Sequence, residues 1–417
     1  MSSTISSTSA AAQAAHRHEM ATTRLPLMAL SFSYFAMVSS SLSMVGALPA
    51  IASGLGVSHA DVARLIAVFF VVYAIAAPLI QICLGHLSRR TLILGGLSLA
   101  ALGAMLSALA PTYTMMLAAR VLTALGAAAI GPVASAIGAS MVAPERQGRA
   151  LATVFLGMTV GSVISTPLAS WVAAAVGWRG MFVSVGVVTM LAALAVAAQI
   201  RDRSAGQRLS PSALLGVLRE PALASGIVVV LFVMAGLLSS YSLIVPVLHE
   251  RFGLSQGTAT LALATFGIAG LFGNALARWL ADHWSADRSL IAALSVVIAV
   301  FVALFAAPRS IAFVFTLIVV WAVAFDVFMP AQQRRMVELA PNLRGLVLAL
   351  NASALYMGMS LGSFVAGQLS THVGLGALPV ASIAFTVAGL VALLLSRRWH
   401  SGKSARLSIA QVAVCGA

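Results

Sequence analysis

The run VWAVAFDVFMPAQQRR, residues 320–335, places the carboxylate of Asp326 inside an otherwise apolar segment. The sequence has 10 acidic residues, and most of the others fall between apolar runs. An ionised side chain in hydrocarbon costs at least about 2.5 kcal/mol, so an acid at this position is a functional-site hypothesis. Asp326 is a candidate for exchanging a proton or binding a cationic or polar substrate group. The competing interpretation is structural: the carboxylate caps a kink near Pro330 or bonds to Gln333.

A second charge, Arg120, also lies inside an apolar run. It falls roughly 9 Å from the start of its segment, whereas Asp326 falls roughly 12 Å from the end of its own, at the helical rise of about 1.5 Å per residue. The two depths differ, so we expect no direct salt bridge between them. Arg120 is a candidate for modulating protonation or binding an anion. The structural alternative is a tie to backbone carbonyls.

Polar and aromatic side chains in other apolar runs are candidates for lining a cavity. Tyr241 lies between two serines, whose hydroxyls suit a polar, largely uncharged ligand such as a sugar or nucleoside. The candidates for an aromatic lining that suits amphipathic drugs are Tyr34, Phe35, Tyr73, Trp321, Phe325 and Tyr356. Asn351 carries an amide that is costly in a membrane unless it is hydrogen-bonded. Serine and aromatic residues also pack helices together, so packing is the competing interpretation.

The composition indicates that these residues lie in a lipid bilayer. Hydrophobic residues make up 61% of the 417 and charged residues 8%, whereas soluble domains are roughly half apolar and a quarter charged. The net charge of +14 is scattered between apolar runs, so nucleic acid is not an expected partner. Cys83 and Cys415 form no metal-ligand or disulfide pattern, and the 8 histidines lie mostly in tails and loops. No metal or cofactor is expected.

Twelve apolar segments of about 20 residues are long enough to span a bilayer. They lie near residues 26–48, 62–84, 91–110, 114–139, 149–174, 180–200, 222–246, 258–281, 289–307, 311–333, 345–369 and 377–397.

The loop charges orient these segments. Nineteen Lys and Arg residues lie in both tails and in the loops after even-numbered segments, against four on the other side, which predicts that both termini are cytoplasmic. The predicted domains are a disordered tail (1–25), two six-helix bundles (26–200 and 222–397), a cytoplasmic linker between them (201–221) and a second tail (398–417).

The two predicted bundles repeat in sequence. GMTVGS from Gly157 recurs as GMSLGS from Gly358, and HLSRRTLI from His86 recurs as HWSADRSLI from His283 with one inserted residue. Two six-helix halves in the same orientation, with a site between them near the midplane, are the parallel-repeat plan of secondary transporters. No Gly-rich loop followed by Gly-Lys-Ser/Thr is found, so a gradient is the expected energy source.

Several motifs together resemble a known family. They are ARVLTALGAAAIGP from Ala119, PERQGRALA from Pro144, GMTVGSVISTP from Gly157, GWRGMF from Gly177 and PNLRGLVLALNASALYMG from Pro341. In order and spacing, over residues 25–399, the chain resembles the major facilitator superfamily. The resemblance is to the twelve-helix drug:proton antiporter branch, which includes inner-membrane efflux pumps for drugs, arabinose-like sugars and purine nucleosides.

The resemblance implies an all-α integral membrane protein with the major facilitator fold, whose twelve helices form two halves related by a pseudo-twofold axis. It implies a monomer in a bacterial inner membrane that exports small organic molecules, including drugs, in exchange for protons by alternating access. The first, fourth, seventh and tenth helices would line the cavity, so that Asp326 faces it. The alternative is a facilitator or proton-coupled uptake of a small polar solute. An enzyme is not expected, since paired carboxylates, a cluster of His and acids and a nucleophile elbow are all missing.

The resemblance also suggests gating residues. Gly157, Gly161 and Pro167 match the family's antiporter motif in the fifth helix, and Gly358 and Gly362 repeat the glycines without the proline. Small residues four apart let helix backbones approach, and a proline bends its helix. A bend is therefore expected only in the first half. Either these glycines act in gating or they only pack helices.

The loop after the second helix departs from the family pattern. Its conserved acid is replaced by Gly85, although the basic end survives as Arg89 and Arg90. The second half keeps an acid in the equivalent stretch, Asp282, so the cytoplasmic gate is expected to rely on it. Arg120 matches the buried arginine of the family's fourth helix.

Overall fold

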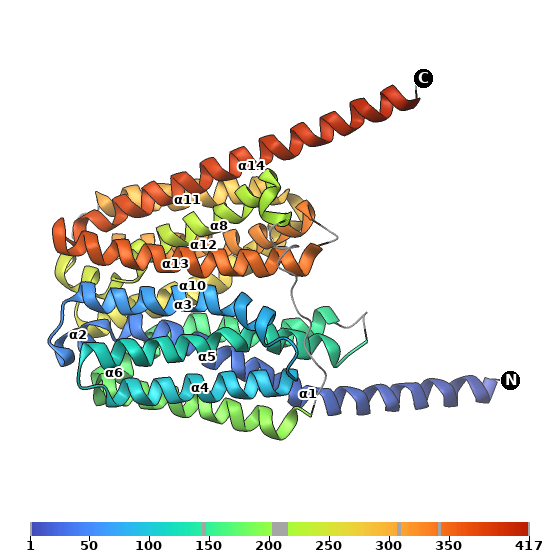
Figure 1. The fold of residues 1–417 in the computed structure, drawn as a ribbon, viewed down its shortest axis with the longest axis horizontal. Coiled ribbons are helices and arrows are strands. Elements are labelled where there is room, and N and C mark those ends of the chain that lie inside the picture. The colour runs from blue at the N-terminus through green and yellow to red at the C-terminus, as the bar shows by residue number, and fades with distance from the viewer. Residues whose placement is uncertain (1, 144–146, 202–215, 307–309, 341–342, 416–417) are drawn as a thin grey trace.

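The computed structural model describes residues 2–143, 147–201, 216–306, 310–340 and 343–415, and it is almost entirely helical (Figure 1). The first half contains α1 (Ser2–Gly46), α2 (Leu48–Leu55), α3 (His59–Cys83), α4 (Arg89–Leu109), α5 (Tyr113–Ser140) and α6 (Gln147–Gln199). The second half contains α8 (Pro221–Tyr241), α9 (Ile244–Pro246), η2 (Val247–Arg251), α10 (Gln256–His283), α11 (Ala286–Phe305), α12 (Ile311–Leu339), α13 (Arg344–His372), η4 (Leu375–Ala377) and α14 (Leu378–Cys415).

Eleven helices in the described residues are long and apolar enough to cross a membrane. The longest, Arg149–Gln199, is interrupted at Gly177, whose φ of 78° and ψ of 164° are not helical. Glycine adopts this positive φ without the steric cost that a Cβ would bring. The break divides the segment into two crossings, so the prediction of twelve transmembrane helices is confirmed.

The repeat between the halves is visible in how their helices begin. Ser58 and Ser255 start α3 and α10, and Ser88 and Ser285 start α4 and α11, each accepting a hydrogen bond from the backbone N–H three residues later. Such caps satisfy N–H groups that lack partners inside the helix. Both pairs of serines are 197 residues apart. The parallel repeat predicted from sequence therefore includes the positions at which equivalent helices begin.

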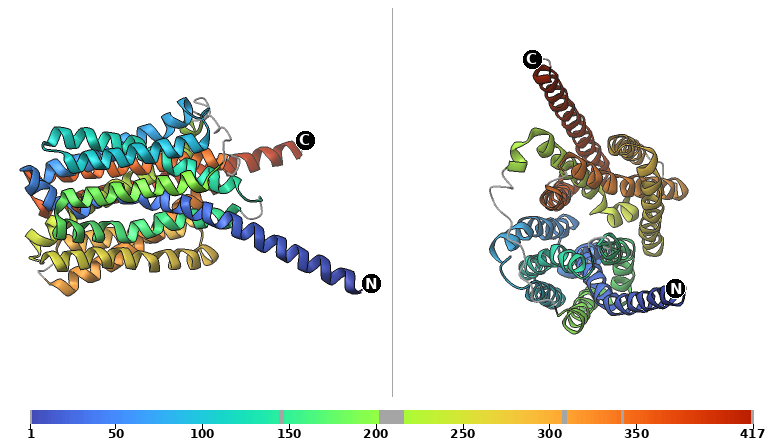
Figure 2. Two further views of the ribbon diagram at one scale, coloured as in Figure 1. Left: turned by 90° about the horizontal axis from the view of Figure 1, so that it is seen from below. Right: turned by 90° about the vertical axis from the view of Figure 1, so that its right-hand side faces the viewer.

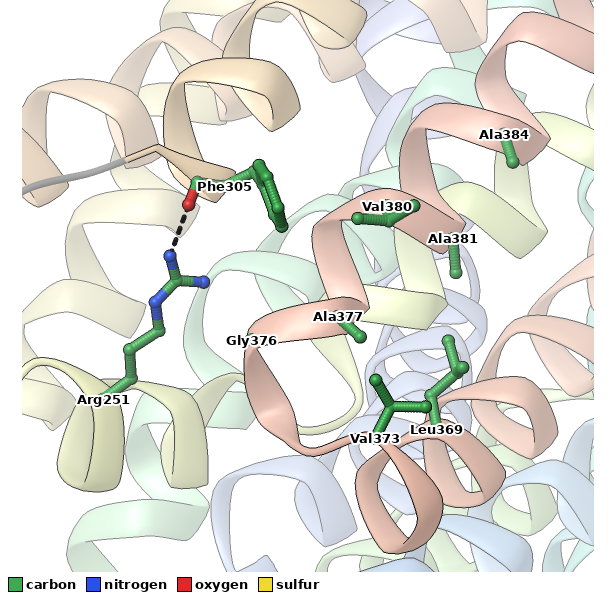
Figure 3. Close-up of a pocket in the computed structure, with 9 residues that line it drawn as sticks. All are labelled: Arg251, Phe305, Leu369, Val373, Gly376, Ala377, Val380, Ala381 and Ala384. Atoms are coloured by element: carbon green, nitrogen blue, oxygen red, sulfur yellow. Dashed lines mark hydrogen bonds between the residues drawn. The ribbon is translucent and has the colours of Figure 1, made fainter.

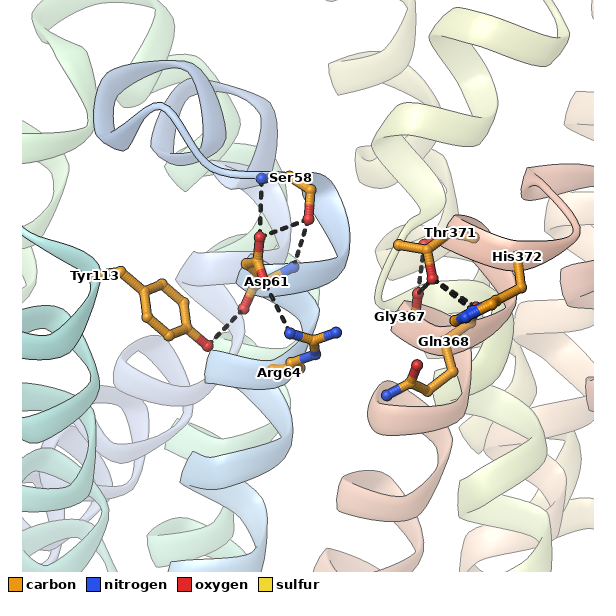
Figure 4. A network of polar contacts seen from close by, with 9 residues as sticks. Ser58, Asp61, Arg64, Tyr113, Gly367, Gln368, Thr371 and His372 are labelled. Atoms are coloured by element: carbon orange, nitrogen blue, oxygen red, sulfur yellow. Dashed lines mark hydrogen bonds and ion pairs between the residues drawn. The ribbon is translucent and has the colours of Figure 1, made fainter.

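Figure 4 shows the first of these caps beside the end of α13. Asp61 accepts from the backbone N–H of Ser58 at 3.1 Å, which completes a capping box, and pairs with Arg64 at 2.9 Å. Tyr113 donates to the Asp61 carbonyl at 3.3 Å. This surface cluster fixes the start of α3 against α5.

The two halves lie side by side, and both chain termini project from the same end of the molecule (Figures 1 and 2). We call this end, which carries Arg89, the Arg89 end, and the opposite one, which carries Ser58, the Ser58 end. Within the halves, α1 packs on α6, α4 on α5, α13 and α14 on α8, and α10 on α12. Between the halves, α3 packs on α13 and α6 on α10.

The terminal helices continue into the tails: in the described residues α1 begins at Ser2 and α14 continues to Cys415. The disorder expected for residues 1–25 stays a prediction. Both helices extend beyond the bundle (Figure 2). The N-terminal stretch is rich in alanine, which has the highest helix propensity. Of the predicted linker 201–221, residues 202–215 lie outside the described part of the chain.

Candidate functional site

The halves contact each other from the Ser58 end to the middle of the bundle. Between α3 and α13, Ser360 donates to the carbonyl of Ala67 at 2.8 Å, and the rings of Tyr73 and Tyr356 lie 3.8 Å apart between centroids. The other polar pairs between the halves are His59 with Glu250 (3.2 Å), Ser170 with Thr260 (2.9 Å), Gln256 with Ser170 (3.0 Å) and Tyr241 with Thr166 (3.3 Å). Among the described residues, no hydrogen bond, ion pair or ring contact joins the halves nearer the Arg89 end. This conformation is closed at the Ser58 end.

A tyrosine cluster, Tyr34, Tyr73 and Tyr356, lies where this contact reaches deepest. Tyr34 is buried, and its hydroxyl donates to the carbonyl oxygen of Gly131 at 2.8 Å and lies 2.7 Å from the hydroxyl of Ser135. The Tyr73 hydroxyl donates a hydrogen bond to Sδ of Met37 at 3.5 Å. The cluster draws on α1, α3 and α13, so both halves contribute to one aromatic surface.

Arg120 is buried in α5 with 1% of its surface exposed. Its Nη1 donates to the carbonyl of Ser40 at 3.0 Å, and its guanidinium lies 4.4 Å from the ring centre of Phe69. Its Nε and Nη2 are buried and have no partner in the described residues, where no acid pairs with it. A carbonyl tie, the predicted structural alternative, is therefore present. It uses only part of the guanidinium and leaves two donors unsatisfied.

Asp326 lies between α12 and α10. Its Oδ1 accepts from the side-chain amide of Asn274 at 3.0 Å. A Cβ at Gly270 or Gly273 would collide with the Asp326 side chain, so these two glycines make room for it. No ion pair to Asp326 is found among the described residues. The predicted structural partners, Gln333 and the turn at Pro330, are replaced by Asn274.

Sequence reasoning missed Asn274 as a functional residue. The available signal was an amide inside the apolar run predicted at 258–281, the same kind of signal that identified Asn351. Asn274 and Asp326 are 52 positions apart, and nothing local in sequence links them. Packing of α10 on α12 brings them together.

Tyr241 connects the halves near the middle of the bundle. Its hydroxyl donates to Oγ1 of Thr166 at 3.3 Å, and its ring meets Trp321 edge-on at 6.1 Å. The neighbouring serine hydroxyls are already bonded: Ser240 pairs with Ser382 at 2.7 Å. Tyr241 thus belongs to the contact between the halves, whereas Ser240 packs α8 against α14.

Asn351 forms an amide cluster inside the second half. Its Oδ1 accepts from Nε2 of Gln332 at 3.1 Å, and the same nitrogen donates to the carbonyl of Gly226 at 2.8 Å. Asn351 and Gln332 are both buried. The cluster joins α8, α12 and α13. Its hydrogen bonds offset the cost of placing an amide inside a membrane.

The glycines assigned to gating are all sites of close helix approach. A Cβ on Gly157 would collide with the backbone of Ser31, and one on Gly161 would lie 2.9 Å from Cβ of Val38, so both fit α6 against α1. In the second half, Gly358 and Gly362 have no room for a Cβ against the backbone of α8. Pro167 lies inside α6, and the helix continues through it. The packing interpretation accounts for all four glycines.

The basic pair of the first half binds backbone. Arg89 donates to the carbonyl of Ala136 at 3.4 Å, and Arg90 to that of Ala197 at 2.9 Å. Both contacts stay inside the first half, holding α4 to the Arg89 ends of α5 and α6.

No ion pair to Asp282 is found in the described residues, and its role at the cytoplasmic gate stays a prediction. The neighbouring acid Asp287 has two basic partners: it pairs with Arg335 at 2.7 Å and with Arg397 at 3.0 Å. Arg335 also donates to Ser396 at 2.8 Å. The start of α11 is therefore clamped to α12 and α14 by Asp287, five residues after the predicted acid.

Comparison with known proteins agrees with this architecture. A family model described as Major Facilitator Superfamily matches residues 30–363. The "Inner membrane transport protein YdhP" of Escherichia coli K12 is 30% identical over 88% of this chain and 94% of its own. The "Chloramphenicol resistance protein" of Streptomyces lividans is 29% identical over 88% and 95%.

Solved structures show the same fold. A bacterial homologue of the human lysosomal transporter Spinster, in an inward-facing and unoccupied conformation, superposes with a TM-score of 0.70 at 19% identity, covering 91% of this chain and 98% of its own. A D-xylose-proton symporter superposes with a TM-score of 0.69 at 14% identity, covering 90% and 97%. The chain therefore belongs to the major facilitator superfamily: it is a multi-pass bacterial inner-membrane transporter and not an enzyme, as predicted.

Proposed function

We propose that this transporter exports a small organic molecule in exchange for protons by alternating access. The observation that carries the proposal is Asp326, a carboxylate inside the membrane-spanning part of α12 that no cation neutralises among the described residues. A partly buried acid that is bonded only to a neutral amide changes its charge when it binds or releases a proton. Such a group is suited to exchange a proton when water reaches it from one side and then from the other.

The substrate class follows from the tyrosine cluster and Arg120. Three phenol rings offer flat apolar faces with hydroxyls, and the unsatisfied guanidinium donors of Arg120 suit an acceptor such as a carbonyl, nitro or hydroxyl oxygen. A small, amphipathic aromatic compound satisfies both. The relative named for chloramphenicol resistance supports export of such a compound.

The conformation within the transport cycle is inferred from the contacts between the halves. We assign the Arg89 end to the cytoplasm because the tails and loops there carry most of the positive charge. The conformation is then closed to the outside, and opening it requires the pairs between α3 and α13 and between α6 and α10 to separate. The bundles 26–200 and 222–397 would rock as units in a monomer.

Transport in cells tests this proposal. Retention of labelled chloramphenicol, a cationic dye, a nucleoside and a pentose is measured with the wild type, Asp326→Asn, Glu338→Gln or an empty vector, with and without an uncoupler. Glu338 lies at the end of the same helix and pairs only locally with Arg334 at 2.7 Å, so it is the matched control.

We expect the wild type and Glu338→Gln to lower retention of the aromatic compound, and the uncoupler and Asp326→Asn each to abolish the effect. Export by Asp326→Asn that equals the wild type and is still abolished by the uncoupler would remove Asp326 from the mechanism. Raised retention in the wild type would favour the alternative, uptake.

A further inference from the structure

A groove of about 880 Å³ opens on the second half at the Ser58 end (Figure 3). It is formed by the end of α11, the end of α13, the turn η4 and the first turns of α14. Phe305, Val373, Val380 and Ala384 are among its walls, and every lining residue except Arg251 is apolar or glycine. Neither Asp326 nor the tyrosine cluster contributes to it, so the groove is separate from the candidate transport site.

The groove continues into a face of α14 that is not covered by protein. Val380 is 47% exposed, and Val387 and Val391 further along the helix are 41% and 49% exposed. Residues three and four apart lie on one side of a helix. Because α14 is one of the membrane-spanning helices, this face borders lipid tails. The groove is therefore open to the surrounding leaflet.

A single cation lies at the head of this apolar path. Arg251 donates from Nη2 to the carbonyl of Phe305 at 2.6 Å, whereas its Nη1 is buried and has no partner. Figure 3 shows Nη1 on the side facing the groove. Burial lowers the pKa of the guanidinium, which nevertheless stays protonated at neutral pH. No acid pairs with Arg251 in the described residues, so its charge is available to a ligand.

We propose that this groove binds one anionic phospholipid of the surrounding leaflet, with its phosphate on Arg251 and an acyl chain along α14. A phosphate oxygen would give the unpartnered Nη1 an acceptor, and guanidinium groups suit phosphate geometry. The apolar walls exclude a ligand that is charged along its length. An anion with a long hydrocarbon chain matches both parts of the site, as an anionic phospholipid does.

The first half provides a matched control. Arg179 donates to the carbonyl of Ala110, beyond the end of α4, at 3.3 Å, and its guanidinium lies 4.1 Å from the ring centre of Trp178. Arg251 likewise caps the end of α11 and lies 5.3 Å from the ring centre of Phe252. Arg179 thus lies at the same end of the molecule as Arg251, makes the same kind of hydrogen bond to a carbonyl and has an aromatic neighbour. It does not line the groove.

Native mass spectrometry of the purified full-length protein in neutral detergent tests the proposal. The wild type, Arg251→Gln, Arg179→Gln and Ala384→Trp are titrated with phosphatidylglycerol, phosphatidylcholine, diacylglycerol and inorganic phosphate. Ala384→Trp fills the groove from an exposed position and leaves Arg251 and its hydrogen bond to Phe305 in place. This variant therefore separates the effect of blocking the groove from the effect of losing the Arg251 cap on α11.

We expect the wild type and Arg179→Gln to bind one phosphatidylglycerol. Arg251→Gln should bind it roughly tenfold more weakly, as for loss of a hydrogen bond to a charged group, and Ala384→Trp should not retain it. Diacylglycerol and inorganic phosphate should not bind at the same concentrations. Equal binding by wild type and Arg251→Gln, an equal loss in Arg179→Gln, or diacylglycerol binding as well as phosphatidylglycerol would each overturn the proposal.

Discussion

Closure at the Ser58 end depends on a glycine that lies between the halves. A Cβ on Gly267 of α10 would lie 2.5 Å from the carbonyl oxygen and 2.8 Å from the Cα of Val163 in α6. These are backbone atoms, which cannot rotate away as a side chain can. Gly267→Leu therefore places a branched side chain where even one carbon does not fit.

The size of the effect follows from where the clash occurs. Overpacking costs about 1–3 kcal/mol in well-packed interiors. Because α6 and α10 belong to different halves, separation of the halves at the Ser58 end relieves the clash without unfolding either bundle. The substitution should then shift the equilibrium toward the state open at that end by roughly 5- to 150-fold.

Distances between labels report this shift. Spin labels are attached to cysteines at Pro111 and Ser310, which are exposed at the Ser58 end in different halves, after Cys83 and Cys415 are replaced by serine. We expect Gly267→Leu to lengthen the distances between the two spin labels. The control Gly95→Leu, where a Cβ meets nothing within 4 Å, should keep the wild-type distribution. A folded Gly267→Leu protein with unchanged distances would refute the assigned closure.

Three further substitutions test the packing. Gly157→Ala should lower the stability of the detergent-solubilised protein by about 1–3 kcal/mol, measured by thermal unfolding, because the methyl group meets the Ser31 backbone, while Gly95→Ala should not destabilise it. Arg335→Met should destabilise by about 2 kcal/mol, since it leaves Asp287 with Arg397 alone, and a melting temperature equal to wild type would show that the buried pair contributes nothing. Gly177→Ala should cost about 1–3 kcal/mol because it forces a positive φ on a residue with a Cβ; an unchanged melting curve would contradict this strain.

Much of the fold could be predicted because its signals are local. The length of apolar runs determines the crossings, and the serine caps that repeat 197 positions apart mark the start of equivalent helices in both halves. Gly177 was predictable as a break between two crossings. The local signal in the tails is ambiguous because polar, alanine-rich sequence is compatible with both disorder and helix, so the disorder expected there stays a prediction.

The candidate site was only partly predictable. The burial of Arg120 and the partial burial of Asp326 followed from their positions in apolar runs. Their partners did not: Asn274 meets Asp326 through packing of two helices, and Tyr73 meets Tyr356 only where the halves close on each other. The pairing of Asp287 with Arg335 and Arg397 inside the second half likewise depends on helix packing. The gating role expected of Asp282 stays a prediction.

Coupled proton movement in proteoliposomes tests the central claim most directly. The purified protein is reconstituted with a pH-sensitive dye inside, and a gradient of the compound that the wild type exports from cells is imposed without a pH gradient. The account predicts that the compound drives protons in the opposite direction through the wild type and Glu338→Gln, and that Asp326→Asn shows no proton signal. Compound movement without a proton signal in the wild type, or an undiminished signal in Asp326→Asn, would contradict it.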